Sequence, residues 1–171
     1  MNPDIDPSEI FEGVRRVRAI RKSGMFTSPN ARHPLFQSAF TELVIYVRDL
    51  VAKAEKAGTR ISFADAVDVT PDCCDVSDLI RIVRDAVCHI DSPKRTIAGT
   101  AVRGSFNVFF RAGVGVTLGN VTVGSAFDDD ICFCYGARRL YLNRHLWRAF
   151  DEAVAVLSRD PQIADLLSSI D

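Results

Sequence analysis

Apolar residues recur every three or four positions in four long segments of the chain, which is the spacing of an amphipathic α-helix. The first of these helices is predicted to start at Asp6-Pro7 and to end at Ser23-Gly24. The others are predicted at about residues 34–57, from residue 72 or 75 to about residue 90, and at about residues 140–157. A final short helix is predicted at residues 162–170, after Asp160-Pro161 has ended the fourth long helix.

The pattern changes between residues 96 and 136, where short stretches of β-type residues alternate with glycine. Seven of the ten glycines lie there, and strands are predicted at residues 105–110, 114–118, 121–123 and 131–135. Leu118-Gly119-Asn120-Val121 predicts a tight turn between two of these strands. The predicted fold class is mainly α: a four-helix bundle in one domain, residues 1–171, with a small antiparallel β insertion at about residues 96–135, between the third and fourth long helices.

Composition and charge restrict the possible functions. The 171-residue chain is 47% hydrophobic and 25% charged, as in soluble globular proteins, and its 21 basic and 22 acidic side chains leave a net charge of -1. Because there is no global positive field, a nucleic-acid site would have to be a local basic patch. The acidic N-terminus and the short apolar runs predict neither a signal peptide nor a membrane span, and hence a cytoplasmic protein.

Cysteines and an acidic run are the candidate metal ligands. The five cysteines form no Cys-x-x-Cys pair, which is typical of free thiols in a reducing compartment rather than of a disulfide framework or a zinc site. Asp128-Asp129-Asp130 is predicted as a solvated turn; a cation site is the alternative, although no EF-hand spacing surrounds it. We therefore expect no metal and no cofactor.

The end of the third predicted helix carries a set of residues suited to phosphate chemistry. Arg81, Asp85 and His89 are spaced four residues apart on one helix face, with Arg84 beside them at the border of the apolar stripe. Imidazole can move protons near neutral pH, a carboxylate one turn away can fix its tautomer, and guanidinium groups bind phosphate bidentately. Such a set can cleave RNA without a metal; the alternative is an ordinary solvated helix border.

This segment resembles a known signature. The residues are Arg84-Asp85-Ala86-Val87-Cys88-His89. They are similar to the Arg-x4–6-His motif of the HEPN superfamily, in which a polar residue commonly follows the arginine, and the layout of long helices around the motif is also similar. The β-rich stretch departs from the minimal HEPN bundle.

The resemblance implies a metal-independent endoribonuclease whose two Arg/His pairs meet at the cleft of a homodimer, often a toxin of a toxin–antitoxin, abortive-infection or other antiphage system. It implies that Arg84 contacts the scissile phosphate and that His89 acts as acid or base on the 2′-OH or the leaving 5′-OH. Asp85 would orient His89 or shape the cleft, and the product would carry a 2′,3′-cyclic phosphate. RNA, a second copy of the chain and an antitoxin or regulatory protein are the implied partners. The alternative is a non-catalytic HEPN-like module that binds nucleotides or other proteins.

Other basic positions are candidate RNA contacts. Arg144, His145 and Arg148 are predicted to share a face of the fourth helix, where Trp147 could stack a base, and Arg81 would extend the site on the third helix. A solvated face with a packed tryptophan is the alternative. A second candidate footprint is the basic face of the first helix, formed by Arg15, Arg18, Arg21 and Lys22. His33, just before the second helix, is predicted to have a local structural role.

Overall fold

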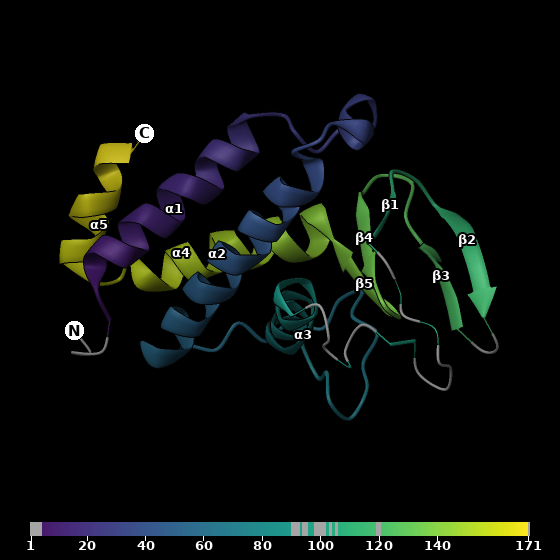
Figure 1. Cartoon of the computed structure of the whole chain (residues 1–171). Coiled ribbons are helices and arrows are strands. Elements are labelled where there is room, and N and C mark those ends of the chain that lie inside the picture. The colour runs from purple at the N-terminus through teal and green to yellow at the C-terminus, as the bar shows by residue number, and fades with distance from the viewer. Residues whose placement is uncertain are drawn as a thin grey trace.

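The computed structural model describes residues 5–89, 93, 96–97, 102, 104, 106–118 and 121–170. Helices occupy one side of the molecule and a small set of antiparallel strands the other (Figure 1). Helix α1 spans Pro7–Lys22, α2 Phe36–Lys56, α3 Val76–Cys88, α4 Arg148–Leu157 and α5 Pro161–Leu167. None of the helices in these ranges combines the length and apolar character needed to cross a membrane. The chain therefore combines a helical body with a small antiparallel β element.

Helix α1 begins and ends where the sequence predicts. Asp6 caps it, because the Asp6 Oδ1 accepts the backbone N–H of Ser8 at 2.8 Å and Pro7 occupies the first turn. The helix packs on α2 at Gly13, where an added Cβ would lie 3.4 Å from Leu50 and 3.7 Å from Tyr46. A Cβ at Gly13 would therefore make ordinary van der Waals contacts with α2.

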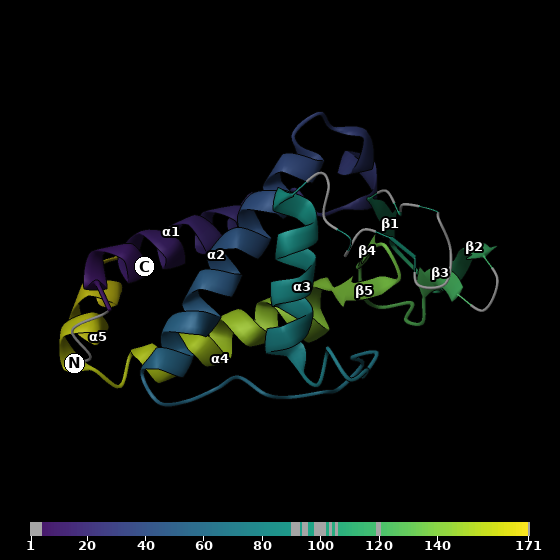
Figure 2. The ribbon, with the colours of Figure 1, turned by 60° about the horizontal axis from the view of Figure 1, so that its bottom comes forward.

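Helix α3 lies between α2 and the strands, in contact with both (Figure 2). It is capped by Asp75, whose Oδ1 accepts the backbone N–H of Asp78 at 3.0 Å. The helix ends at Cys88, and His89 has extended backbone angles of φ -120° and ψ 104°. The prediction that the helix continues to about residue 90 is therefore wrong at His89, which follows the helix. Residue 90 is outside the described residues.

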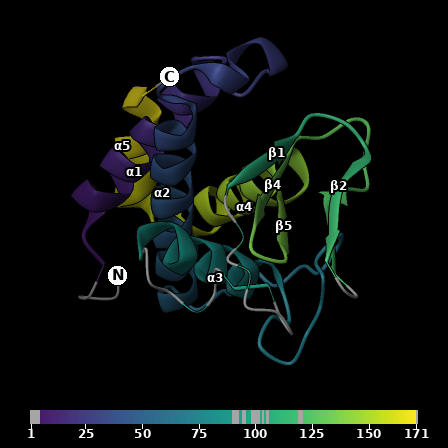
Figure 3. The same ribbon diagram turned by 45° about the vertical axis from the view of Figure 1, so that its right-hand side comes forward.

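The predicted antiparallel insertion is confirmed in the strands that the structure describes. They are β1 Asn107–Phe109, β2 Gly113–Leu118, β3 Val121–Ser125, β4 Cys132–Tyr135 and β5 Arg138–Tyr141. Strands β1, β4 and β5 form one sheet in that order, and β2 and β3 form a separate hairpin at the outer edge (Figure 3). The predicted turn of this hairpin falls on residues 119–120, which are outside the described residues.

The start of the fourth long helix is corrected by the structure. Residues 138–141 are strand β5, paired with β4, instead of the beginning of a helix at residue 140. A π-helical segment, Leu142–Trp147, follows directly and continues into α4. Asp130 supports this junction, because its carboxylate accepts the backbone N–H groups of Asn143 and Arg144, each at 2.9 Å. These bonds satisfy donors that a helix start leaves without partners.

Aromatic side chains join the sheet to the helices. Phe133 of β4 lies against Phe40 of α2 with 4.4 Å between ring centroids, and Phe26 and Phe106 pack around this pair. All the rings belong to one continuous core shared by α2, α3 and the sheet. Burial of so much aromatic surface fixes the sheet against α2 and α3.

Candidate functional site

The cationic residues at the end of α3 pair with neighbouring carboxylates. The Arg84 Nη1 lies 3.3 Å from the Asp85 Oδ1, and the Arg81 Nη2 lies 3.3 Å from the Asp78 Oδ1. Burial alone would raise the pKa of Asp78, but the backbone N–H of Cys74 and the nearby guanidinium groups outweigh it and hold the pKa below its ordinary value. These ion pairs are long and partly exposed, so they leave the guanidinium groups of Arg81 and Arg84 accessible to another anion.

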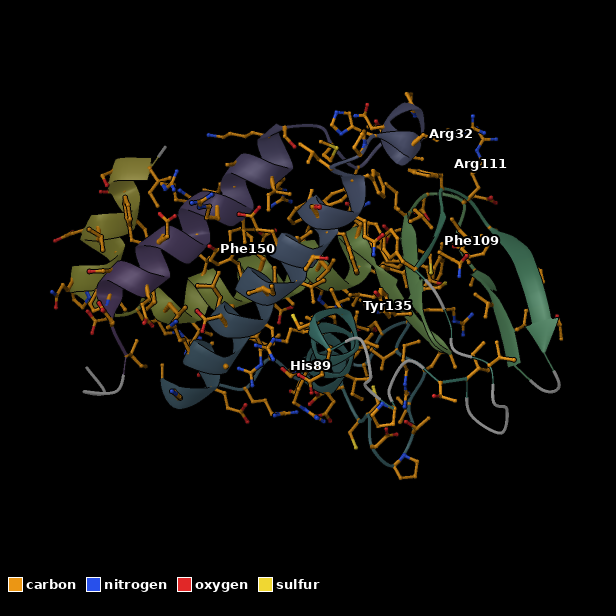
Figure 4. The ribbon with its side chains drawn as sticks, in the orientation of Figure 1. Arg32, His89, Phe109, Arg111, Tyr135 and Phe150 are labelled. Carbon is orange, nitrogen blue, oxygen red and sulfur yellow. The ribbon has the colours of Figure 1, made fainter. Side chains whose placement is uncertain are left out.

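His89 is exposed at the C-terminal end of α3, where Figure 4 labels it. Its backbone N–H donates to the Asp85 carbonyl at 3.1 Å and closes the last turn of the helix. The predicted Asp85–His89 neighbourhood thus exists through the backbone. Because the chain departs from helical geometry at His89, the regular helix face on which the sequence pattern placed this side chain does not extend to it.

A solvent-open groove of about 470 Å³ runs between α2 and α3. Arg81, Arg84 and Asp85 line it from α3, and Arg48 and Asp49 line it from α2. The structure therefore brings three of the predicted site residues together and adds a third arginine. The volume of the groove lies within the range of small-molecule binding sites. His89 is not among the residues that line it.

Arg48 was missed by the sequence interpretation because its contribution depends on tertiary packing. The available signal was Ile45, an apolar residue off the buried stripe of α2 that is 36% exposed. Ile45 and Tyr46 line the groove beside Arg48. A single exposed apolar residue is common on protein surfaces, so this signal alone does not identify the groove.

The groove carboxylate on α2 is engaged by a lysine. The Asp49 Oδ2 pairs with the buried Lys53 Nζ, which also lies 3.0 Å from the Glu9 Oε2. Burial opposes the charge on Lys53, but the two carboxylates keep its pKa above the ordinary value. Lys53 therefore stays charged and is shared between Asp49 and Glu9, so the Asp49 carboxylate is partly compensated within the protein.

The predicted RNA-binding face of the fourth helix is not formed as a single face. Arg144 lies over the Phe127 ring, 3.9 Å from its centroid, and pairs with Asp129 at 2.9 Å. Arg148 pairs with Asp65 at 2.8 Å and lies 3.8 Å from the Phe63 centroid. The π-helical turn changes the angular spacing on which the prediction depended, and both arginines fix local structure.

His145 is fully buried, which corrects its prediction as a surface contact to RNA. The His145 Nδ1 accepts the backbone N–H of Tyr141 at 3.1 Å, and the Nε2 lies 3.0 Å from the Asp65 carbonyl oxygen. The bond from Tyr141 requires an unprotonated Nδ1, so the hydrogen is on Nε2 and donates to Asp65. Burial lowers the pKa of His145, which keeps the imidazole neutral.

Two of the basic positions predicted on the first helix, Arg15 and Arg21, also have structural partners. Arg15 pairs with Glu12 at 2.7 Å, and Arg21 lies over the largely buried Trp147 and pairs with Asp151. Trp147 is only 7% exposed, so it is packed rather than presented to a base. His33 has the predicted local role, because its Nδ1 accepts the backbone N–H of Leu35 at 3.1 Å.

The candidate metal ligands have other roles: the cysteines are free thiols, and Asp130 caps the start of a helix. Cys132 and Cys134 are buried with their sulfurs 3.5 Å apart, and all five cysteines are free thiols. Asp130 is buried and bonded to backbone N–H groups, so the acidic run is only partly the solvated turn that was predicted. Within the described ranges, no three His, Cys, Asp or Glu side chains are grouped as they would be to hold a metal ion.

Comparison of the chain with protein-family models, with curated proteins and with solved structures gave no match. The interpretation of the site therefore rests on its own residues, which are those of the arginine-lined groove and of the end of α3.

Proposed function

We propose that the protein is a metal-independent endoribonuclease of the HEPN type, a four-helix bundle with a β insertion that acts as a homodimer. The observation that carries the proposal is the position of Arg84. Its guanidinium lines a solvent-open groove with two further arginines, and the exposed His89 directly follows the helix that bears it. An RNA phosphate can reach this guanidinium, and an imidazole follows it within one and a half helical turns.

The chemistry is an internal transfer of the phosphodiester. The 2′-oxygen of the ribose attacks the adjacent phosphorus, an O2′–P bond forms and the P–O5′ bond breaks. His89 accepts the proton of the 2′-OH or donates one to the leaving 5′-oxygen, and Arg84 stabilises the extra charge on the phosphoryl oxygens. The products are a 2′,3′-cyclic phosphate and a 5′-OH, so the reaction consumes no water and needs no redox partner.

Substitution of the two motif residues tests the proposal. Purified Arg84→Ala and His89→Ala proteins are each expected to cleave RNA at least about 100-fold more slowly than the parent protein in the presence of EDTA. His33→Ala is the matched control, because His33 is also exposed and lies outside the groove. Unchanged cleavage by both motif variants, with the fold retained, refutes the assignment.

A non-catalytic HEPN-like module that binds a nucleotide or another protein is the second candidate. It is favoured by one observation, the extended backbone at His89, which places this residue outside the set that lines the groove with Arg84. Expression in cells separates the two functions. A ribonuclease toxin slows growth and its His89→Ala form does not, whereas a binding module has the same effect in both forms.

A further inference from the structure

Arg48 is a cation with which no carboxylate of the described residues forms an ion pair. It is half-buried in the wall of the α2–α3 groove, and it has no hydrogen bond or ion pair within the part of the chain that the structure describes. Asp49, beside it, is occupied by the buried Lys53. A partly buried guanidinium that pairs with no carboxylate has lost part of its hydration without compensation. An added anion therefore binds there with a more favourable free energy than at the paired arginines.

An aromatic and apolar surface adjoins this cation. Ile45 and Tyr46 line the groove beside Arg48, and both also line an adjoining hollow of about 450 Å³ nearer the start of α2. The Tyr46 ring rests against α1 at Gly13, where the position of an added Cβ lies 3.7 Å from the ring. Tyr46 is thus supported from behind by α1 and remains partly exposed.

The two hollows form a track along α2. The second hollow reaches Ser38, and the first reaches Asp49, a distance of about 16 Å at the rise of an α-helix. Arg16 lines the second hollow and pairs with Glu12 at 2.7 Å and with Glu42 at 3.5 Å, whereas Arg48 lines the first hollow and has no such partner among the described residues. An aromatic residue beside a cation of the latter kind is found on surfaces that bind single-stranded nucleic acid.

We infer that this α2 track holds single-stranded RNA beside the cleavage site, with Arg48 on a phosphate and Tyr46 under a base. The inference rests on the proposed function, because it locates the RNA substrate of that reaction next to Arg84. The Arg48 guanidinium forms two N–H···O bonds to the phosphate, as its planar geometry allows. Tyr46 stacks on any base, so the track selects unpaired RNA rather than a particular sequence.

Binding of an uncleavable strand tests the inference apart from catalysis. The probe is a fluorescent, fully 2′-O-methylated single-stranded RNA oligonucleotide, whose anisotropy reports its affinity for the wild-type protein. Tyr46→Leu and Arg48→Ala are each expected to weaken binding by about tenfold. The two losses differ in their salt dependence, because Arg48→Ala removes one phosphate contact and lowers the log–log salt slope by about 0.7, whereas Tyr46→Leu leaves the slope unchanged.

Arg111→Ala is the matched control. Arg111 is an exposed arginine in the turn after β1 that lines neither hollow, and Figure 4 labels it at the strand end of the molecule, above His89 in the view. Its substitution is expected to leave both the affinity and the salt slope unchanged. Equal binding by Arg48→Ala and Arg111→Ala, with both variants folded, overturns the inference. So does a loss of binding by Arg48→Ala that coincides with a change of oligomeric state, since the track is then an interface between copies.

Failure of the proposed function gives a different result. If wild-type protein binds the oligonucleotide through Arg48 and Tyr46 but does not cleave unmodified RNA, the nuclease assignment fails and the track stands. If RNA is cleaved through Arg84 and His89 while Arg48→Ala binds and cleaves as the wild type does, the nuclease stands and the track fails.

Discussion

His89 and His145 each follow an arginine within five residues in the sequence, yet they have opposite environments. His89 is exposed after the end of α3, whereas His145 is fully buried between β5 and the loop that contains Asp65. The difference arises from hydrogen bonds, because both ring nitrogens of His145 have backbone partners. At the residue scale, an imidazole with two backbone partners is a structural element, and an exposed one is available for proton transfer.

The buried imidazole makes the stability of the protein depend on pH. Because burial lowers the pKa of His145 from its ordinary value of 6.5, the unfolded chain takes up a proton below that pH while the folded protein does not. The free energy of unfolding should therefore decrease as the pH falls below 6.5, by up to about 1.4 kcal/mol per pH unit for this one proton. Urea unfolding of the wild-type protein between pH 7.5 and 5.5 measures this slope.

His145→Gln removes the titrating group and should reduce the slope, although it is also expected to lower the stability at pH 7.5. His33→Gln provides the comparison, since His33 is exposed. An identical pH slope in wild type and His145→Gln would show that this histidine does not control the acid stability.

At the scale of elements, the helices and strands were largely predictable from periodicity. Helix α1 has the predicted bounds, and the predicted strands at residues 114–118 and 131–135 overlap β2 and β4. The boundary at residue 140 was not predictable, because Arg138–Tyr141 has no strand alternation: two arginines are followed by two buried apolar residues, which resemble the start of the next helix. Pairing with β4, which is not a local property, makes these residues a strand.

The strand-to-helix junction depends on one buried carboxylate. Asp130 accepts the backbone N–H groups of Ile131, Asn143 and Arg144 at 2.8, 2.9 and 2.9 Å. Asp130→Ala leaves these donors without partners in a buried position, so we expect a decrease of about 3 kcal/mol in the free energy of unfolding, measured by urea denaturation. Asp129→Ala is the matched control and should unfold at nearly the wild-type urea concentration, because the Asp129 side chain is exposed. Equal midpoints for the two variants would contradict the role given to Asp130.

At the scale of the whole molecule, the packing of α3 on α2 creates the candidate site. Arg81, Arg84 and Asp85 were predictable from their spacing on one helix, but Arg48 lies 36 residues earlier than Arg84 and joins them only across the groove. Sequence spacing describes a single element, so it cannot reveal which residues of two elements face each other. For the same reason, the buried position of His145 was not predictable from the polar residues beside it.

The proposed cleft requires two copies of the chain. A homodimer in which the ends of both α3 helices meet is expected to have twice the chain mass by light scattering. Its cleavage rate per chain should fall when the protein is diluted below the dissociation constant of the dimer. A protein that is monomeric at every concentration and nevertheless cleaves RNA at a constant rate per chain would contradict the two-fold site.

The most direct measurement is mass spectrometry of a defined RNA oligonucleotide after incubation with the wild-type protein and with His89→Ala in EDTA. We predict that the wild-type protein produces fragments ending in a 2′,3′-cyclic phosphate and that His89→Ala leaves the oligonucleotide intact over the same time. Intact RNA with the wild-type protein, or the same fragments at the same rate with His89→Ala, would contradict the assignment of Arg84 and His89 as a ribonuclease site.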